Sequence, residues 1–421
     1  MRPCDLLLTD IGQLVTMAGP PGPWRGPRTD LPVVEDAAVA IEGGRILAAG
    51  PRAEVVAAHA PKATRSARGK VVLPGFVDPH THLPWVGSRE REFEQKLLGV
   101  SYAEIAKAGG GIRATTRATR TAGVEAIVAA ARPRLGRMLA HGTTTAEAKS
   151  GYGLDLETER RQLEAVALLD RAQPIDLVAT NLAAHEVPDE WRHDRQGWIA
   201  RLVDEVLPAL RPQAEFVDVF CEAHVFSTDE SRRILGRARE LGYRLKVHAD
   251  ELEPTGGAEL AVELGATSAD HLACTSDQGI AALAASDTVA VLLPGTSFYL
   301  RLKRHAPARR LLDAGAAVAL ATDCNPGSSL TESMPMIVTL ACLNLGMTPA
   351  EALVAATINA AHAIARGDDR GSIAPGKRAD LVVWDAPSWR YLPSHFGVSL
   401  VDTVIKDGRV VHAATVEGAR A

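Results

Sequence analysis

The sequence predicts an α/β protein in which a (β/α)8 TIM barrel carries a small β-sandwich domain built from both chain ends. Three observations predict this fold. Short β-like runs occupy both ends of the chain, apolar strands alternate with amphipathic helices between them, and histidine and acidic residues gather where those strands end. The chain has 421 residues, more than a typical single core holds, so one large domain and one smaller domain are expected.

Both ends of the chain consist of short apolar runs that Gly, Pro and Asp turns separate. Neither end alone has enough runs to bury two faces of a sandwich, so we expect the two ends to fold together. The runs are Cys4–Thr9, Ala37–Ile41, Arg45–Ala49, Val71–Leu73, Ala379–Trp384 and Val401–Val411. The predicted domains are residues 1–72 with 371–421, which form the composite sandwich, and residues 73–370, which form the catalytic barrel.

The middle of the chain, between about Val77 and Ile364, has the alternating pattern of a barrel. The expected strands are Val71–Asp78, Thr143–Ala148, Ile175–Leu182, Phe216–Glu222, Arg244–Ala249, Ser268–Leu272, Thr288–Leu293 and Val318–Thr322. The helical stretches include Leu156–Leu169, Trp198–Leu210, Thr228–Leu241, Ala258–Leu264 and Met334–Leu345. A doubly wound open sheet is the competing layout, but no glycine-rich phosphate turn follows the first strand to favour it.

Composition excludes several classes of protein. The net charge of −5 and the lack of a basic stripe give no reason to expect a nucleic-acid partner. The first residues read as neither a signal peptide nor a membrane span, because Thr9 and Asp10 interrupt their apolar run. The five cysteines are scattered and form no C-x-x-C pair, which favours a reducing cytoplasm over a disulfide framework.

Functional groups of such barrels lie at the carboxyl ends of the strands, and the histidines of this chain follow that rule. A random scatter of 13 histidines would not collect there. In chain order, the residues at these strand ends are His80 and His82, His185, then His248, Asp250 and Glu251, then Asp270 and His271, and finally Asp323.

His80 and His82 are two residues apart on an extended segment, so their side chains point to the same side and can bind one ion. His248 and Asp323 complete a metal site that leaves one position open for water. Imidazole with carboxylate suits both zinc and iron, and the sequence does not separate them. Any one of these histidines taken alone is better explained as a hydrogen-bonded core or surface residue, so the argument rests on the set.

A catalytic metal lowers the pKa of a bound water from near 16 to about 7 and polarises a carbonyl group under attack. A proton must then reach the leaving group. Glu251, His271 and Asp323 are the candidates for moving it, and the order among them is open. For His271 a second role also stays open, in which it only orients water or substrate.

The segments Leu73–His82 and Gly371–Val382 resemble the start and the end of the barrel in the amidohydrolase superfamily. The resemblance implies a metal-dependent hydrolase with this two-domain fold. In relatives with two metals, a carboxylated lysine ends the fourth strand and bridges the ions. Here Cys221–His224 ends that strand without a lysine, which implies one zinc or iron ion. Lys149 is interpreted as a structural salt-bridge lysine, and His224 as a solvated loop residue or an extra ligand.

Four further motifs resemble the imidazolonepropionase family, over essentially the whole chain. They are residues Ala146–Leu154, Ala184–Pro188, Val247–Glu251 and Ala321–Ser329. Ala223-His224 and Cys324 depart from the family pattern at positions that carry no role. The resemblance implies hydrolysis of the cyclic amide C–N bond of 4-imidazolone-5-propanoate to N-formimino-L-glutamate, a step of histidine degradation.

The family resemblance also implies a set of substrate contacts. A small lactam with a propionate tail requires a cationic clamp, and Arg89 takes that role because a planar guanidinium pairs with a carboxylate through two hydrogen bonds. Without the resemblance, Arg89 is one charge among several in a surface run. The resemblance also implies Tyr102 as a lid residue, Tyr152 and His185 as ring and tail contacts, and Glu251 as a carboxylate that hydrogen-bonds substrate or water. Asn325, Gly327 and Ser328 would hold the far end of substrate or product.

Two rival interpretations remain. An amidohydrolase-superfamily deaminase acting on another small ring would release ammonia and leave Arg89 without an anionic partner. A catalytically dead barrel serving as a scaffold would have lost a metal ligand, whereas all four predicted ligands are present. The oligomeric state stays open, with a homodimer as one possible assembly.

Overall fold

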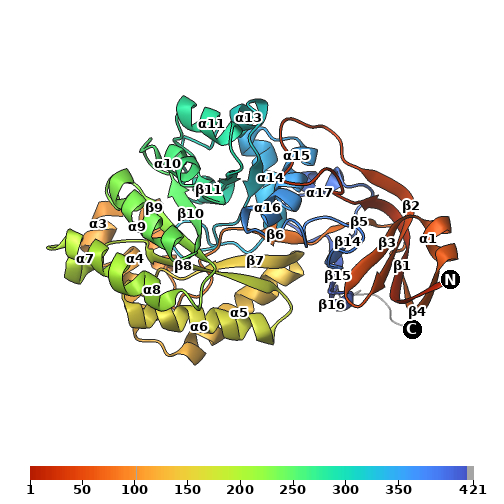
Figure 1. Cartoon of the computed structure of the whole chain (residues 1–421), viewed down its shortest axis with the longest axis horizontal. Helices are drawn as coiled ribbons and strands as arrows, with labels where there is room; N and C mark the ends of the chain where they lie inside the picture. Colours follow the sequence, from red (N-terminus) through yellow and green to blue (C-terminus); the bar gives the residue numbers. More distant parts are fainter. Residues whose placement is uncertain (101, 415–421) are drawn as a thin grey trace.

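The computed structural model describes residues 1–100 and 102–414. It contains two eight-stranded sheets. One sheet is a parallel barrel surrounded by helices, and the other lies at one end of the molecule, where the N-terminus and β16 are found (Figure 1). The predicted combination of a barrel with a separate sheet made from both chain ends is therefore confirmed.

The barrel strands are arranged in sequence order, from β6 to β13, and every neighbouring pair is parallel. This order is that of eight consecutive strand–helix units, as the alternating pattern predicted. The strands are β6 (Phe76–Asp78), β7 (Thr143–Lys149), β8 (Asp176–Ala184), β9 (Phe216–Cys221), β10 (Arg244–Ala249), β11 (Ser268–His271), β12 (Val289–Leu292) and β13 (Val318–Leu320).

The first and last barrel strands are joined just beyond their carboxyl ends. The backbone N–H of Thr322 donates to Asp78 Oδ1 at 3.0 Å, and its hydroxyl donates to Asp78 Oδ2 at 2.5 Å. Next to this pair, the N–H of Asp323 donates to the carbonyl of His80 at 3.0 Å. Burial raises the pKa of the Asp78 carboxyl to about 7. The barrel therefore closes where two predicted metal ligands lie.

The helices cover the outside of the barrel. Those before β9 are α2 (Glu90–Leu97), α3 (Tyr102–Lys107), α4 (Ile112–Arg120), α5 (Val124–Ala140), α6 (Leu156–Ala172), α7 (Arg195–Arg201) and α8 (Leu207–Leu210). Those after it are α9 (Thr228–Glu240), α10 (Gly257–Glu263), α11 (Asp277–Ala284), α12 (Pro294–Tyr299), α13 (Ala308–Asp313), α14 (Met334–Leu345), α15 (Pro349–Ala355) and α16 (Ile358–Ala363).

One predicted helix is interrupted. The stretch expected over Trp198–Leu210 consists of α7, a π-helical turn at Leu202–Val206, and α8. Pro208 has no N–H to donate, and its ring crowds the carbonyl four residues earlier. The wider π-helical turn before it relieves this crowding and lets the helix continue.

The second sheet joins the two chain ends through β5 and β14, which pair antiparallel. Its order is β16-β15-β14-β5-β1-β2-β3, with β4 paired to β1. Ile46 and Ile405 come from strands far apart in this order yet share one buried cluster, so the sheet curls around a common core. The strands are β1 (Arg2–Val15), β2 (Val33–Glu42), β3 (Arg45–Pro51), β4 (His59–Ser66), β5 (Val71–Pro74), β14 (Leu381–Trp384), β15 (Val401–Lys406) and β16 (Arg409–Ala413), accompanied by α1 (Arg52–Ala58) and α17 (Tyr391–Ser394).

The run expected as a single strand over Val71–Asp78 is two strands in two different sheets. β5 belongs to the sheet of the chain ends and β6 to the barrel, and Gly75 lies between them. A Cβ at Gly75 would lie 2.2 Å from Thr144 Oγ1, so only glycine allows this close approach. An apolar run without polar alternation did not reveal the break.

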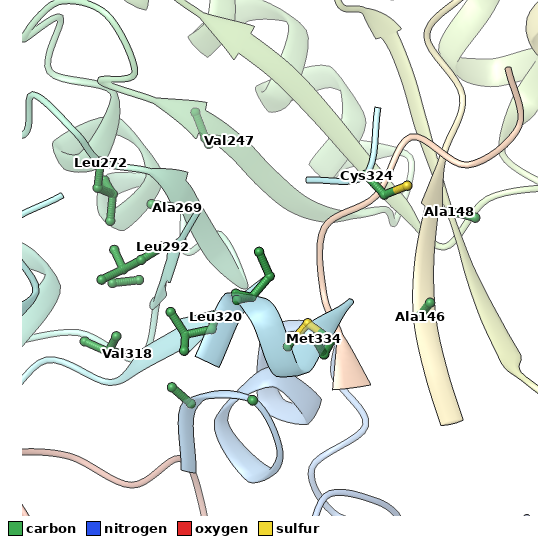
Figure 2. Packing of buried hydrophobic residues seen from close by; sticks show 14 of the residues in the cluster. Ala146, Ala148, Val247, Ala269, Leu272, Leu292, Val318, Leu320, Cys324 and Met334 are labelled. Atoms are coloured by element: carbon green, nitrogen blue, oxygen red, sulfur yellow. The ribbon is translucent and has the colours of Figure 1, made fainter. Parts of the chain in front are cut away.

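Alternation along the barrel strands separates an outer apolar layer from a polar interior. Figure 2 shows Val247, Ala269 and Leu292 among the apolar side chains of the largest buried cluster, together with Met334 of the covering helix α14. Because successive side chains of a strand point to opposite sides, Lys246 and His248 point away from the face of Val247. The same strands that pack against the helices on one face therefore direct polar groups into the barrel on the other.

None of the helices in residues 1–100 and 102–414 has the length and apolar character of a membrane span.

We predict that a chain ending after Val398 does not fold, because it lacks β15 and β16 and exposes the apolar side of β14. Val404 and Ile405 of β15 are fully buried, so their loss removes part of the shared core. Solubility after expression and the cooperativity of thermal unfolding measure the effect. A chain ending after Ala414 retains every described strand and is the control. A soluble truncated chain with a cooperative transition would contradict the two-ended sheet as a folding requirement.

Candidate metal centre

The structure brings the four predicted metal ligands together at the carboxyl end of the barrel. Asp323 Oδ1 lies 3.5 Å from His80 Nε2 and 3.4 Å from His82 Nε2. The ring centroid of His248 lies 4.5 Å from that of His80 and 5.4 Å from that of His82. All four side chains are buried.

The ligand atoms of this cluster suit a cation. His80 Nε2 is buried and has no hydrogen-bond partner, although the other nitrogen of the same ring is paired. Burial, as the main cause, holds the pKa values of His80 and His82 well below their usual range, so both imidazoles are neutral at pH 7. A neutral imidazole has a free lone pair on one nitrogen, which is the form that binds metal. The donor set of three imidazoles and one carboxylate therefore fits one zinc or iron ion.

Two buried carboxylates orient two of the imidazoles. His80 Nδ1 lies 2.6 Å from Asp270 Oδ2, and His248 Nδ1 lies 2.8 Å from Asp218 Oδ2. A carboxylate at Nδ1 favours the tautomer with its proton on that nitrogen, which leaves Nε2 for the metal. Sequence reasoning did not assign a role to Asp218 or Asp270. The signal was an acidic residue inside an apolar barrel strand, where an unpaired charge is costly.

Three more polar groups surround the ligands: His271 and Thr296, which are buried, and Glu251, which is partly buried. His271 Nε2 lies 3.6 Å from Glu251 Oε2, and the His271 ring lies edge-on to His80 with centroids 5.4 Å apart. Burial lowers the pKa of His271 to about 3, and burial together with the charge of Asp323 raises the pKa of Glu251 well above its usual range. The Thr296 hydroxyl donates to Asp323 Oδ2 at 2.6 Å, a contact that the sequence did not reveal.

Three residues at this site have an unusual backbone conformation. Asp250, His271 and Asp323 have φ values of 51°, 79° and 52°, in the left-handed region that non-glycine residues rarely adopt. The Asp250 carboxylate does not point to the ligands. Instead it accepts N–H groups of the following loop, from Thr255 at 3.0 Å and from Gly257 at 3.0 Å. Asp250 thereby stabilises the loop that follows the ligand His248.

A cavity of about 690 Å³ opens above the cluster. Lys96, Glu186, Phe220 and Tyr299 contribute to its wall and were not predicted from the sequence. The predicted substrate contacts that line it are Arg89, Tyr152, His185, Glu251, Asn325, Gly327 and Ser328. The side chain of the remaining predicted contact, Tyr102, lies outside the described residues.

Arg89 lies at the cavity wall with its guanidinium held by Glu92. Its Nε donates to Glu92 Oε2 at 2.8 Å. The guanidinium also packs closely against Gly327, where any side chain would collide with it, because a Cβ would lie only 2.1 Å from an Arg89 nitrogen. Glu92 in turn accepts the N–H of Gly111 at 2.9 Å. The guanidinium is therefore fixed between α2 and the loop after β13, which limits the conformational entropy lost on binding an anion.

Tyr152 and His185 form an aromatic side of the cavity next to a metal ligand. The rings of His82 and His185 stack with centroids 5.0 Å apart, and Tyr152 lies 5.4 Å from His185. His185 Nδ1 is 2.9 Å from the carbonyl of Gly151. Burial raises the pKa of Tyr152, so its hydroxyl stays a hydrogen-bond donor. This side suits a flat polar ring.

The loop after β13 is built around the Asn325 amide. Its Oδ1 accepts the N–H groups of Gly327 and Ser328 at 2.8 Å each, and its Nδ2 donates to the Asp323 carbonyl at 2.8 Å. Both ends of the amide are thus occupied within the loop. Asn325 shapes this side of the cavity, in addition to any contact with a ligand.

Lys149 and His224 differ in their surroundings. The Lys149 ammonium lies 2.7 Å from both Glu147 and Asp218 and is fully buried, which confirms the salt-bridge interpretation. His224 is exposed and lines the cavity. Within the described part of the chain, His224 does not join a group of side chains close enough to share a metal.

We predict that His248→Ala purifies with little or no bound metal, because it removes one of four ligands. Elemental analysis after dialysis against metal-free buffer measures the effect. His193→Ala, which changes an exposed histidine, is the matched control and should retain the metal content of the unmodified protein. Equal metal content in His248→Ala and the control would exclude His248 as a ligand.

Comparisons with known proteins agree with this geometry. The Amidohydrolase family profile matches residues 71–411. An imidazolonepropionase of Geobacillus kaustophilus (strain HTA426) is 51% identical over 98% of each chain, and one of Bacillus cytotoxicus is 51% identical over 97% of each chain.

Solved structures show the same fold at low identity. An adenosine deaminase of Xanthomonas campestris with bound zinc has a TM-score of 0.70 at 22% identity, and the match covers 97% of this chain and 93% of the deaminase. A triazine hydrolase variant has a TM-score of 0.71 at 18% identity, covering 97% and 94% of the two chains. These likenesses concern the fold alone.

Proposed function

The chain belongs to the amidohydrolase family, and we infer that it hydrolyses the cyclic amide of 4-imidazolone-5-propanoate to N-formimino-L-glutamate. The identity of 51% over 98% of each chain to an imidazolonepropionase supports this reaction. The observation that carries the inference is a single cavity with the His–Asp cluster at its base and Arg89 at its wall. A small ring with an anionic tail matches that combination.

His80, His82, His248 and Asp323 would hold one zinc or iron ion. When bound, the ion supplies a Lewis acid and lowers the pKa of a coordinated water. A single ion is supported by the end of β9, where Cys221 is followed by no lysine that could be carboxylated. It is also supported by the Lys149 ammonium, which already places a positive charge among the buried carboxylates.

The chain's own groups would position the ring and move the proton. Asp323 is held by Thr296 on one oxygen, and its other oxygen faces the imidazoles, where it can accept a proton from the attacking water. Glu251 and His271 lie next to each other in the wall of the same cavity and can hydrogen-bond the ring or deliver the proton to the leaving nitrogen. Separating these roles requires pH–rate profiles of variants at all three positions.

Arg89 would bind the propionate tail. Its guanidinium is fixed by Glu92, and Tyr152 and His185 line the same cavity beside the metal ligands, where the ring would lie. Asn325, Gly327 and Ser328 would contact the far end of substrate or product, with Tyr102 expected over the tail. Tyr299 and Phe93 pack with ring centroids 5.2 Å apart and add an apolar section of wall.

We predict that Arg89→Ala raises KM roughly 10- to 100-fold, because hydrogen bonds to a charged group contribute about 1.5–3 kcal/mol. The KM of Arg89→Lys should lie between those of the unmodified protein and Arg89→Ala, since lysine keeps the positive charge but cannot form the paired hydrogen bonds of a guanidinium. The loss of ultraviolet absorbance of freshly made imidazolone propionate gives the rates. The control is Arg91→Ala, an exposed neighbour. An unchanged KM in Arg89→Ala would refute the clamp.

The product separates this reaction from the rival deamination. We expect formiminoglutamate in amounts equal to the substrate consumed, without ammonia release, because water opens the ring and no amino group leaves. Quantifying both compounds in the same reaction tests this. Ammonia as the main product would favour the deaminase, and no turnover by metal-loaded protein would favour a scaffold.

We also propose a cytoplasmic location for the enzyme. It is supported by the five cysteines, all of which are free thiols in the described residues.

A further inference from the structure

We propose that two buried lysines, Lys149 and Lys246, are positioning residues of the metal centre and act through Asp218 and Asp270. This inference rests on the metal site proposed above. Both lysines point into the barrel, on β7 and β10, and neither touches the cavity. They would not contact substrate or metal, so their role would be to hold the groups that do.

The two ammonium groups and three carboxylates form one connected network. Lys149 Nζ lies 2.7 Å from Glu147 Oε2 and 2.7 Å from Asp218 Oδ2. Lys246 Nζ lies 3.1 Å from the same Glu147 oxygen and 3.3 Å from Asp270 Oδ2. All five side chains are fully buried.

The network ends on the metal ligands. Asp218 Oδ2, which contacts Lys149, is also the oxygen at His248 Nδ1. Asp270 Oδ2, which contacts Lys246, is also the oxygen at His80 Nδ1. A single carboxylate oxygen therefore links each lysine to the imidazole of a metal ligand.

The remaining carboxylate oxygens and the ligand backbone are held as well. Asp218 Oδ1 accepts the N–H of His248 at 3.1 Å, and Asp270 Oδ1 accepts the Ser268 hydroxyl at 2.6 Å. Lys246 also donates to the carbonyl of Pro79, the residue before His80, at 2.5 Å. Lys246 thus holds His80 in two ways, directly through the backbone carbonyl of the preceding residue and indirectly through Asp270, which contacts the His80 ring.

The two lysines offset the electrostatic repulsion between the buried carboxylates. Three buried carboxylates repel each other strongly, and the two ammonium groups that contact them offset that repulsion. Without one ammonium, a carboxylate would move away from its neighbours and carry its imidazole with it. Carboxylate partners of metal-binding histidines commonly change metal affinity by roughly 10- to 100-fold when they are removed.

The position of the network argues against a purely structural role. Buried ion pairs add little stability compared with apolar packing, and another part of the barrel is packed with apolar residues such as Val77 and Val289. The charged groups instead occupy the layer that includes Asp270 and His248, next to the ligands. Apolar residues would have filled this layer at lower cost if filling were the only requirement.

We expect Lys149→Met and Lys246→Met to weaken metal binding roughly 10- to 100-fold. Competition between the purified protein and a chelator of known zinc affinity measures the dissociation constant without any substrate. The matched control is Lys406→Met, which removes a buried lysine of the second sheet that contacts Asp380 and also Asp176, at the amino end of barrel strand β8. The control should lower the melting temperature and leave zinc affinity unchanged.

A charge-balanced variant separates positioning from stability. Lys149→Met combined with Glu147→Gln restores the net charge of the network, so the melting temperature should recover and the protein should fold even if Lys149→Met alone does not. Zinc affinity should stay low, because Asp218 Oδ2 still lacks its ammonium partner.

Unchanged zinc affinity in the double variant or in Lys246→Met would overturn the inference, and so would an equal loss of affinity in Lys406→Met. Failure of the unmodified protein to bind zinc or iron would instead overturn the proposed metal site itself.

Discussion

The closure of the barrel is the constraint on which the site depends. His80 and Asp323 are far apart in the sequence, and Asp78 helps to bring them together by accepting from Thr322 through both carboxylate oxygens where the first and last strands meet. The neighbouring hydrogen bond from the Asp323 N–H to the His80 carbonyl then sets the separation of the two ligands. A small error in closure would misplace a ligand, since metal–ligand distances vary by only about 0.2 Å.

The second constraint is the cost of burying so many polar groups together. Neutral imidazoles reduce that cost, because burial has already lowered the pKa values of His80 and His82. The charges of the carboxylates beneath them are offset by Lys149 and Lys246. The strained backbone of His271 and Asp323 is a further local cost, which the packed barrel can support. The residues at these strand ends therefore both form the reactive site and lower the stability of the barrel that carries it.

The barrel and the gathering of the ligands could be predicted because they depend on local patterns: apolar periodicity, and histidines at strand ends. The break at Gly75 could not, because it depends on how closely Thr144 approaches, and the sequence gives no distances. The partners of His80 and His248 were missed for a similar reason. Asp270 and Asp218 lie in strands whose apolar character indicated only burial, and which oxygen meets which nitrogen depends on strand order and register.

The division between barrel and loops explains how one fold can serve different substrates. The ligands lie at the ends of β-strands or directly after them, whereas the substrate contacts proposed here lie mostly on the following loops, such as Arg89 and Ser328. Solved structures with the same fold at 18% and 22% identity include a triazine hydrolase variant and an adenosine deaminase. Those identities leave room for different loops around a similar barrel. In this chain Glu92 fixes Arg89 against the loop after β13, so the anionic tail of a substrate would be bound at a set distance from the ligands. Specificity would then depend on that distance as much as on the charge.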